Sequence, residues 1–102
     1  MKKNYYKDLT ILIVSFAASN NVLRILKKIP KDIKVVIVEN SKDYKLQKKI
    51  SQKFLNAKVI IPAKNGGNGA GINFGYKYIK TNYFIYIDCD VYFKKDLFKI
   101  LF

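Results

Sequence analysis

Four short runs of apolar residues, mostly β-branched or aromatic, recur along this chain with room for a helix between each pair. They do not alternate polar and apolar positions, which is the pattern of strands buried on both faces of a parallel sheet. Antiparallel strands with one solvated face would alternate. The runs are residues 9–16, 34–38, 57–61 and 83–87.

Three helical segments are predicted between the strands, and a fourth follows the last strand. Their apolar residues recur at spacings of three and four, which places them on one face of a helix. We expect Ser19 or Asn20 to cap the first helix and Pro30 to close it, and Ser41 or Asp43 to cap the second. The segments are 22–29, 46–54, 70–79 and a helix starting at Asp96.

Strands that alternate with helices at this spacing predict an α/β fold with a parallel, Rossmann-like βαβαβαβ arrangement and right-handed crossovers. Helices are expected on both faces of the sheet. A chain of 102 residues makes a single domain over residues 1–102. Ligands of such sheets bind beyond the carboxyl ends of the strands, so candidate site residues are sought there.

Missing residue types exclude several kinds of site within this chain. It has one cysteine, Cys89, and no histidine, so an internal disulfide, a Cys/His zinc site and a histidine-dependent triad are excluded. Any metal ion must be held by oxygen atoms. No apolar run approaches the ~18 residues of a membrane-spanning helix, and we expect a cytoplasmic protein.

Twenty basic residues against seven acidic ones give a net charge of +13. Such a charge suggests nucleic acid, an anionic membrane surface or a phosphorylated small molecule as partner. Arg24 is the only arginine, whereas readers of base edges and phosphates favour the bidentate guanidinium. We therefore expect no nucleic-acid partner, interpret most lysines as solvated surface, and leave open peripheral contact with the anionic inner face of a membrane.

Paired acids stand at the end of the fourth predicted strand. Asp88 and Asp90 flank Cys89, and in an extended chain their carboxylates would point the same way, about 6.5–7 Å apart, with Cys89 packing on the other side. Two such carboxylates can share Mg²⁺ or Mn²⁺, which typically combine one or two carboxylates with substrate phosphates. A pair of solvated acids is the alternative.

A glycine-rich segment, residues 65–75, joins the third strand to the third predicted helix. Its glycines let the backbone approach a ligand or the sheet closely, and helix N-terminal amides favour anions. It is not a P-loop, since no Gly-Lys-Ser/Thr follows, and it departs from G-x-G-x-x-G because Phe74 replaces the last glycine. A flexible turn with close helix packing is the alternative.

Glu39 and Asn40 end the second predicted strand. An acid at that place commonly accepts a hydrogen bond from a ribose hydroxyl in nucleotide-binding βαβ folds. A helix-capping cluster with Ser41 and Asp43 is the other interpretation of these residues.

In order along the chain, four motifs resemble the family 2 glycosyltransferases with the GT-A fold. The resemblance covers nearly the whole chain and implies the nucleotide-binding half of that fold. It further implies transfer of a sugar from a nucleotide-diphosphate donor, such as a UDP- or dTDP-sugar, to a glycan or lipid-linked acceptor in cell-surface polysaccharide biosynthesis. The motifs are residues 10–16, 36–41, 65–75 and 83–91.

The resemblance also implies roles for the matching residues. Ser15 and Phe16 would line the nucleotide pocket, and Glu39 would hold the base or ribose. Asp88 and Asp90 would hold Mg²⁺ or Mn²⁺ and, through it, the diphosphate. Further residues implied in donor binding are Asn40, Asn65, Gly67, Gly69, Gly71 and Asn73.

This sequence departs from the family pattern in two respects. Glu39 stands where aspartate is commoner, which changes its reach by one methylene. Family members are longer, with the acceptor half and catalytic base after the D-x-D, so this chain is expected to be an incomplete fragment that transfers no sugar alone, and no residue is assigned as the base.

Two other functions fit parts of the pattern. A Rossmann-type dinucleotide-binding domain would use an acid about 20 residues after the glycines to hold a ribose, and Asp88 or Asp90 lies at that distance. A non-catalytic, lysine-rich module that binds anions would need only the basic surface.

Overall fold

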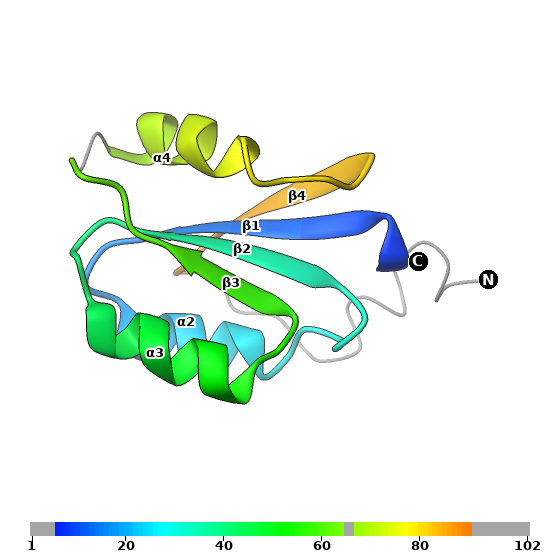
Figure 1. Cartoon of the computed structure of the whole chain (residues 1–102), viewed down its shortest axis with the longest axis horizontal. Coiled ribbons are helices and arrows are strands. Elements are labelled where there is room, and N and C mark those ends of the chain that lie inside the picture. The colour runs from blue at the N-terminus through cyan, green and yellow to red at the C-terminus, as the bar shows by residue number, and fades with distance from the viewer. Residues whose placement is uncertain (1–5, 65–66, 91–102) are drawn as a thin grey trace.

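The computed structural model describes residues 6–64 and 67–90. In this part of the chain four parallel strands alternate with three helices and form one sheet in the order β3-β2-β1-β4, with α2 and α3 on one face and α4 on the other (Figure 1). The elements are β1 (Leu9–Ser15), α2 (Ser19–Leu26), β2 (Lys34–Glu39), α3 (Tyr44–Lys53), β3 (Ala57–Ile60), α4 (Gly67–Tyr76) and β4 (Tyr83–Asp88).

The predicted parallel α/β fold is therefore confirmed, and each predicted strand matches an observed one to within a residue at either end. β1 lies between β2 and β4, in a register that places Ser15 opposite Glu39 and Val14 opposite Asp88. The carboxyl ends of these three strands thus meet at one edge of the sheet. The helix expected from Asp96 lies outside the described residues.

Two apolar clusters, one on each face of the sheet, explain why β1 and β2 show no alternation. Successive residues of a strand point to opposite faces. Ile11 and Ile13 of β1 are buried in the cluster that includes the apolar residues of α2 and α3. Leu12 and Val14 are buried in the second cluster, against Ile72 and other residues of α4. Because both faces are covered, every position of β1 is buried.

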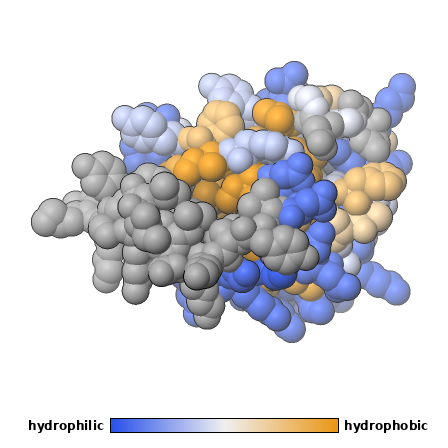
Figure 2. All heavy atoms as spheres, turned by 180° about the vertical axis from the view of Figure 1, so that it is seen from behind, coloured by the Kyte–Doolittle hydropathy of each residue, from blue (hydrophilic) through white to orange (hydrophobic). Residues whose placement is uncertain are grey.

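β4 forms an edge of the sheet within the described residues and is less buried than β1. Tyr83 and Phe84 at its start are exposed. The Phe84 ring meets the ring of Tyr76 edge to face, with centroids 5.6 Å apart. Seen from behind, hydrophobic residues are visible among hydrophilic ones (Figure 2).

Helix boundaries depart from the prediction more than strand boundaries do. The expected cap of α2 is wrong: the helix begins at Ser19 after Ala18, with no side-chain cap, and ends at Leu26, before Pro30. For α3 the prediction is confirmed, since the Leu46 amide donates to Asp43 at 2.9 Å. α4 begins at residue 67, earlier than the predicted 70. None of the described helices is both long and apolar enough to cross a membrane.

Candidate functional site

The candidate site lies at the carboxyl edge of the sheet, where β1, β2 and β4 end side by side. The chain builds the sheet outward from β1 through β2 to β3 and then returns to place β4 on the other side of β1. The space between β1 and β4 is therefore a topological switch point, the usual ligand position in open α/β sheets. Asp88, the last residue of β4, stands directly at this point.

The chain turns sharply after Asp88, and the turn gathers the two carboxylates. The backbone amide of Asp90 donates to Asp88 Oδ1 at 3.0 Å, and the side-chain amide of Asn21 in α2 donates to Asp90 Oδ1 at 3.3 Å. One potential ligand atom each from Asp88, Cys89 and Asp90 lies within 4.8 Å of the others. The expected separation of 6.5–7 Å is wrong because it assumed an extended chain through Asp90.

This donor set suits a hard divalent cation. Asp88 and Asp90 are exposed, and their carboxylate oxygens are the ligands that Mg²⁺ and Mn²⁺ prefer. Two ligands of one Mg²⁺ lie at most about 4.2 Å apart, twice its bond length. The upper limit of 4.8 Å, which also covers the Cys89 atom, is close to that distance, and the side chains of Asp88 and Asp90 are exposed.

Cys89 is a poor ligand despite its position. Its side chain is partly buried against the core cluster on the α2 and α3 face, as expected for a small packing residue. Burial raises the pKa of the Cys89 thiol, and the carboxylates of Asp90 and Asp88 raise it further. The shift disfavours the thiolate, the form that binds metals, and Mg²⁺ and Mn²⁺ prefer oxygen ligands to sulfur. Burial also raises the pKa of the Tyr86 hydroxyl in the same strand, and negative charge on Asp88 and Cys89 raises it further.

Glu39 is fully buried and forms the centre of the turn after β2. Its Oε2 accepts hydrogen bonds from the Ser41 amide and the Ser41 hydroxyl, both at 2.7 Å, and from the Asp43 amide at 3.0 Å. Ser15 Oγ, also buried, donates to Oε1 at 3.5 Å. The structure thus contains the capping cluster of Glu39, Ser41 and Asp43, which was one of the two interpretations of the sequence. A ribose hydroxyl would have to displace one of these donors to reach Oε2.

Ser41 also ties the loop after β1 to the loop after β2. Its Oγ accepts a hydrogen bond from the Ala17 amide at 3.0 Å. Ala17 and Lys42 both have positive φ, 50° and 57°, a conformation that is uncommon without glycine and that clusters at functional sites. Phe16, just before Ala17, is left 60% exposed at the carboxyl edge.

The other predicted donor-binding residues lie around α4. Asn40 is buried close to Gly71, and both line a small cavity of about 120 Å³ beside Phe74. Gly67, with φ of +83°, and Gly69 have open space beside them. Asn73 is exposed on α4, and Asn65 lies outside the described residues.

Two residues of this edge had no assigned site role in the sequence-based prediction. Asn21 contacts Asp90 from the first turn of α2, and Ser41 joins two loops to Glu39. Both are residue types favoured near helix starts, so a capping pattern after each strand is the signal that could have found them. The capping pattern could not identify their partners, because these are distant in the sequence. Asp90 lies 69 residues from Asn21, and Ala17 lies 24 residues from Ser41.

Two comparisons with known proteins bear on the family of this chain. A search of curated proteins found no match. A family model, Glycosyl transferase family 2, matches residues 3–102, so the match includes all four strands, the glycine-rich segment and the Asp88-Cys89-Asp90 turn. This chain, with its all-parallel α/β sheet, belongs to glycosyl transferase family 2.

Proposed function

We propose that the carboxyl edge binds the diphosphate of a nucleotide-sugar donor, together with a Mg²⁺ or Mn²⁺ ion held by Asp88 and Asp90. The observation that carries this proposal is the turn at residues 88–90, which brings two exposed carboxylates together at the switch point between β1 and β4. Without a cation the same carboxylates would repel a diphosphate. A bound cation would neutralise the charge of the diphosphate leaving group.

The surrounding residues support a nucleotide at this edge. The first turn of α2 adjoins Asp90 through Asn21, so the positive end of the helix dipole faces the same space and favours an anion. The exposed ring of Phe16 is available to pack against a base, and Glu39 keeps the adjoining turn in shape. We assign the donor as a UDP- or dTDP-sugar and the acceptor as a glycan or lipid-linked glycan, without assigning the acceptor's base to any residue.

Metal-dependent binding of uridine diphosphate tests the proposal. We expect Mn²⁺ to tighten binding to the full chain by at least about tenfold relative to chelator, about 1.4 kcal/mol. Asp88→Asn and Asp90→Asn should each remove most of this gain. Asp32→Asn makes the same chemical change at an exposed position away from this turn and should keep the gain. Isothermal titration calorimetry measures all four proteins.

Two results would count against this function. Equal affinity for uridine diphosphate with Mn²⁺ and with chelator would remove the role of Asp88 and Asp90. Tighter binding of NADH than of uridine diphosphate, independent of metal, would favour the dinucleotide-binding alternative instead.

A further inference from the structure

We propose that a second site, at the opposite edge of the sheet, binds a phosphate ester through lysine side chains. The site is a pocket of about 470 Å³, called here the amino-edge pocket, and it goes beyond the nucleotide site because it uses none of the same residues. Its volume falls within the range of about 300–1,000 Å³ typical of small-molecule sites. Among its lining residues are Lys34, Lys58, Lys80, Val36, Leu55 and Tyr78.

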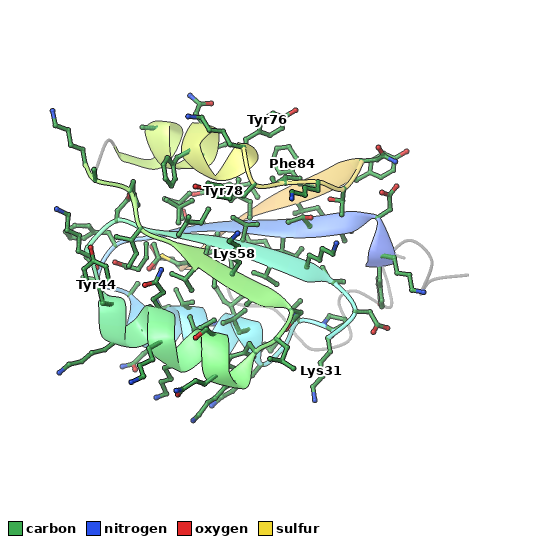
Figure 3. The ribbon with its side chains drawn as sticks, viewed as in Figure 1. Lys31, Tyr44, Lys58, Tyr76, Tyr78 and Phe84 are labelled. Carbon is green, nitrogen blue, oxygen red and sulfur yellow. The ribbon has the colours of Figure 1, made fainter. Side chains whose placement is uncertain are left out.

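The pocket lies at the beginnings of the strands, where residues of the α4 face and of the loops before β2 and β3 line it together. Lys58 of β3 pairs in register with Val36 of β2, and Val36 belongs to the cluster on that face. Tyr78 and Lys80 follow α4 in the chain and contribute the other side. Figure 3 shows Lys58 and Tyr78 together on the α4 side of the sheet, whereas Lys31 lies toward the α3 side.

Hydrogen bonds between loops hold the rim in place. The hydroxyls of Thr10 and Thr81 are 2.6 Å apart and join the segment after α4 to β1. The side chain of Asn56 donates to the Ile33 carbonyl at 2.8 Å and joins the loop before β3 to the loop before β2. The pocket is therefore built from tied segments, and its shape does not depend on side-chain positions alone.

The charge of the pocket is strongly one-sided. Lys34, Lys58 and Lys80 line it, with Lys31 toward the α3 side (Figure 3), and Asp32 is the only acid among the described lining residues. Lys58 Nζ lies 5.2 Å from the centre of the Tyr78 ring, a cation–π contact between two residues that line the pocket. Like charges gathered around one hollow attract a counter-anion, and lysine binds phosphate as a point charge.

The apolar lining indicates that the ligand carries more than a phosphate. Val36, Ala57 and Tyr78 line the pocket together with the lysines. Leu55 lies at the same pocket and is 93% exposed, so an apolar or ring-shaped group bound there would cover it. A phosphate ester with an organic body matches both halves of the lining, whether it is a free metabolite or the headgroup of a phospholipid.

Binding of inorganic pyrophosphate in the presence of chelator tests the charged half of the pocket. We expect the Lys58→Gln/Lys80→Gln double variant to raise the dissociation constant by about tenfold. Lys27→Gln/Lys48→Gln, which makes the same charge change at exposed positions outside the pocket, should change it less than about twofold. An equal loss in both double variants, or no measurable binding to the wild-type chain, would overturn the proposal.

The design separates this pocket from the carboxyl-edge site. Lys58→Gln/Lys80→Gln should weaken metal-free pyrophosphate binding while keeping the Mn²⁺-dependent gain for uridine diphosphate, because neither lysine belongs to the carboxyl-edge site. Glucose 6-phosphate and vesicles of phosphatidylcholine with phosphatidic acid then distinguish the two sources of the ester. Binding of either one that is weakened by Lys58→Gln/Lys80→Gln supports the site, and failure of both to bind overturns the organic-ester assignment.

Discussion

Replacing Glu39 by alanine should lower the free energy of unfolding by about 3 kcal/mol. The carboxylate is fully buried and accepts two hydrogen bonds from Ser41 and one from the Asp43 amide. Alanine would leave those donors without their acceptor, and it would leave a cavity below the turn after β2. Urea denaturation followed by circular dichroism measures the loss.

Two further variants separate the carboxylate's structural role from a role in ligand binding. Glu39→Gln keeps one acceptor oxygen for Ser41 and Asp43 and should cost only about 1 kcal/mol. Ser41→Ala removes the hydroxyl that bonds Glu39 and the Ala17 amide and should cost a similar amount. If Glu39→Ala unfolded within about 0.5 kcal/mol of the wild type, the carboxylate would not stabilise the turn and a ligand-binding role would explain it better.

The sheet could be predicted from the sequence because its signal is local and repeated. Each buried parallel strand is a continuous apolar run, so the run's ends mark the strand's ends, as for residues 34–38 against the observed Lys34–Glu39. Helix starts are less well marked. α4 begins at Gly67, in a glycine-rich segment whose weak helix propensity hides the first turn.

The sequence predicted which candidate residues lie close together, but not their detailed geometry. The strand ends meet at one edge of the sheet as expected, since Ser15 lies opposite Glu39 and Val14 opposite Asp88. The distance between the carboxylates of Asp88 and Asp90 depends instead on the turn at Asp90. Strand periodicity does not predict that turn. The contact of Asn21 with Asp90 depends on how α2 packs on the sheet, which is information carried by the whole fold.

The lysines illustrate the same limit. Net charge alone favours a solvated basic surface, and most lysines of the described residues are exposed. Lys34, Lys58 and Lys80 nevertheless line one pocket because parallel strands begin at a common edge and the segment after α4 returns there. These lysines differ from the other lysines because the strand topology brings them to one pocket from distant positions in the sequence.

Gly75→Ala should destabilise the protein by about 1–2 kcal/mol, although alanine is the better helix former by about 1 kcal/mol. A Cβ at residue 75 would lie 2.5 Å from Leu12 Cδ1 and 2.9 Å from Val38 Cγ2. Both partners are buried in the core cluster under α4, so they cannot move aside without disturbing the packing. Gly71→Ala should act likewise, because its Cβ would lie 2.7 Å from Val14 Cγ1.

Gly69→Ala is the matched control, since it lies in the same helix and a Cβ there would meet no atom within 4 Å. It should leave stability unchanged or raise it by up to about 1 kcal/mol, as helix propensity predicts. Thermal and urea unfolding of the three variants would give opposite signs for position 69 and for positions 71 and 75. The same sign at all three would mean that α4 does not approach the sheet this closely. If the stability changes have opposite signs, contact of α4 with β1 and β2 explains why Gly71 and Gly75 are four residues apart. Ligand binding by the glycine-rich segment would then involve the first turn of α4, where Gly67 and Gly69 have open space beside them.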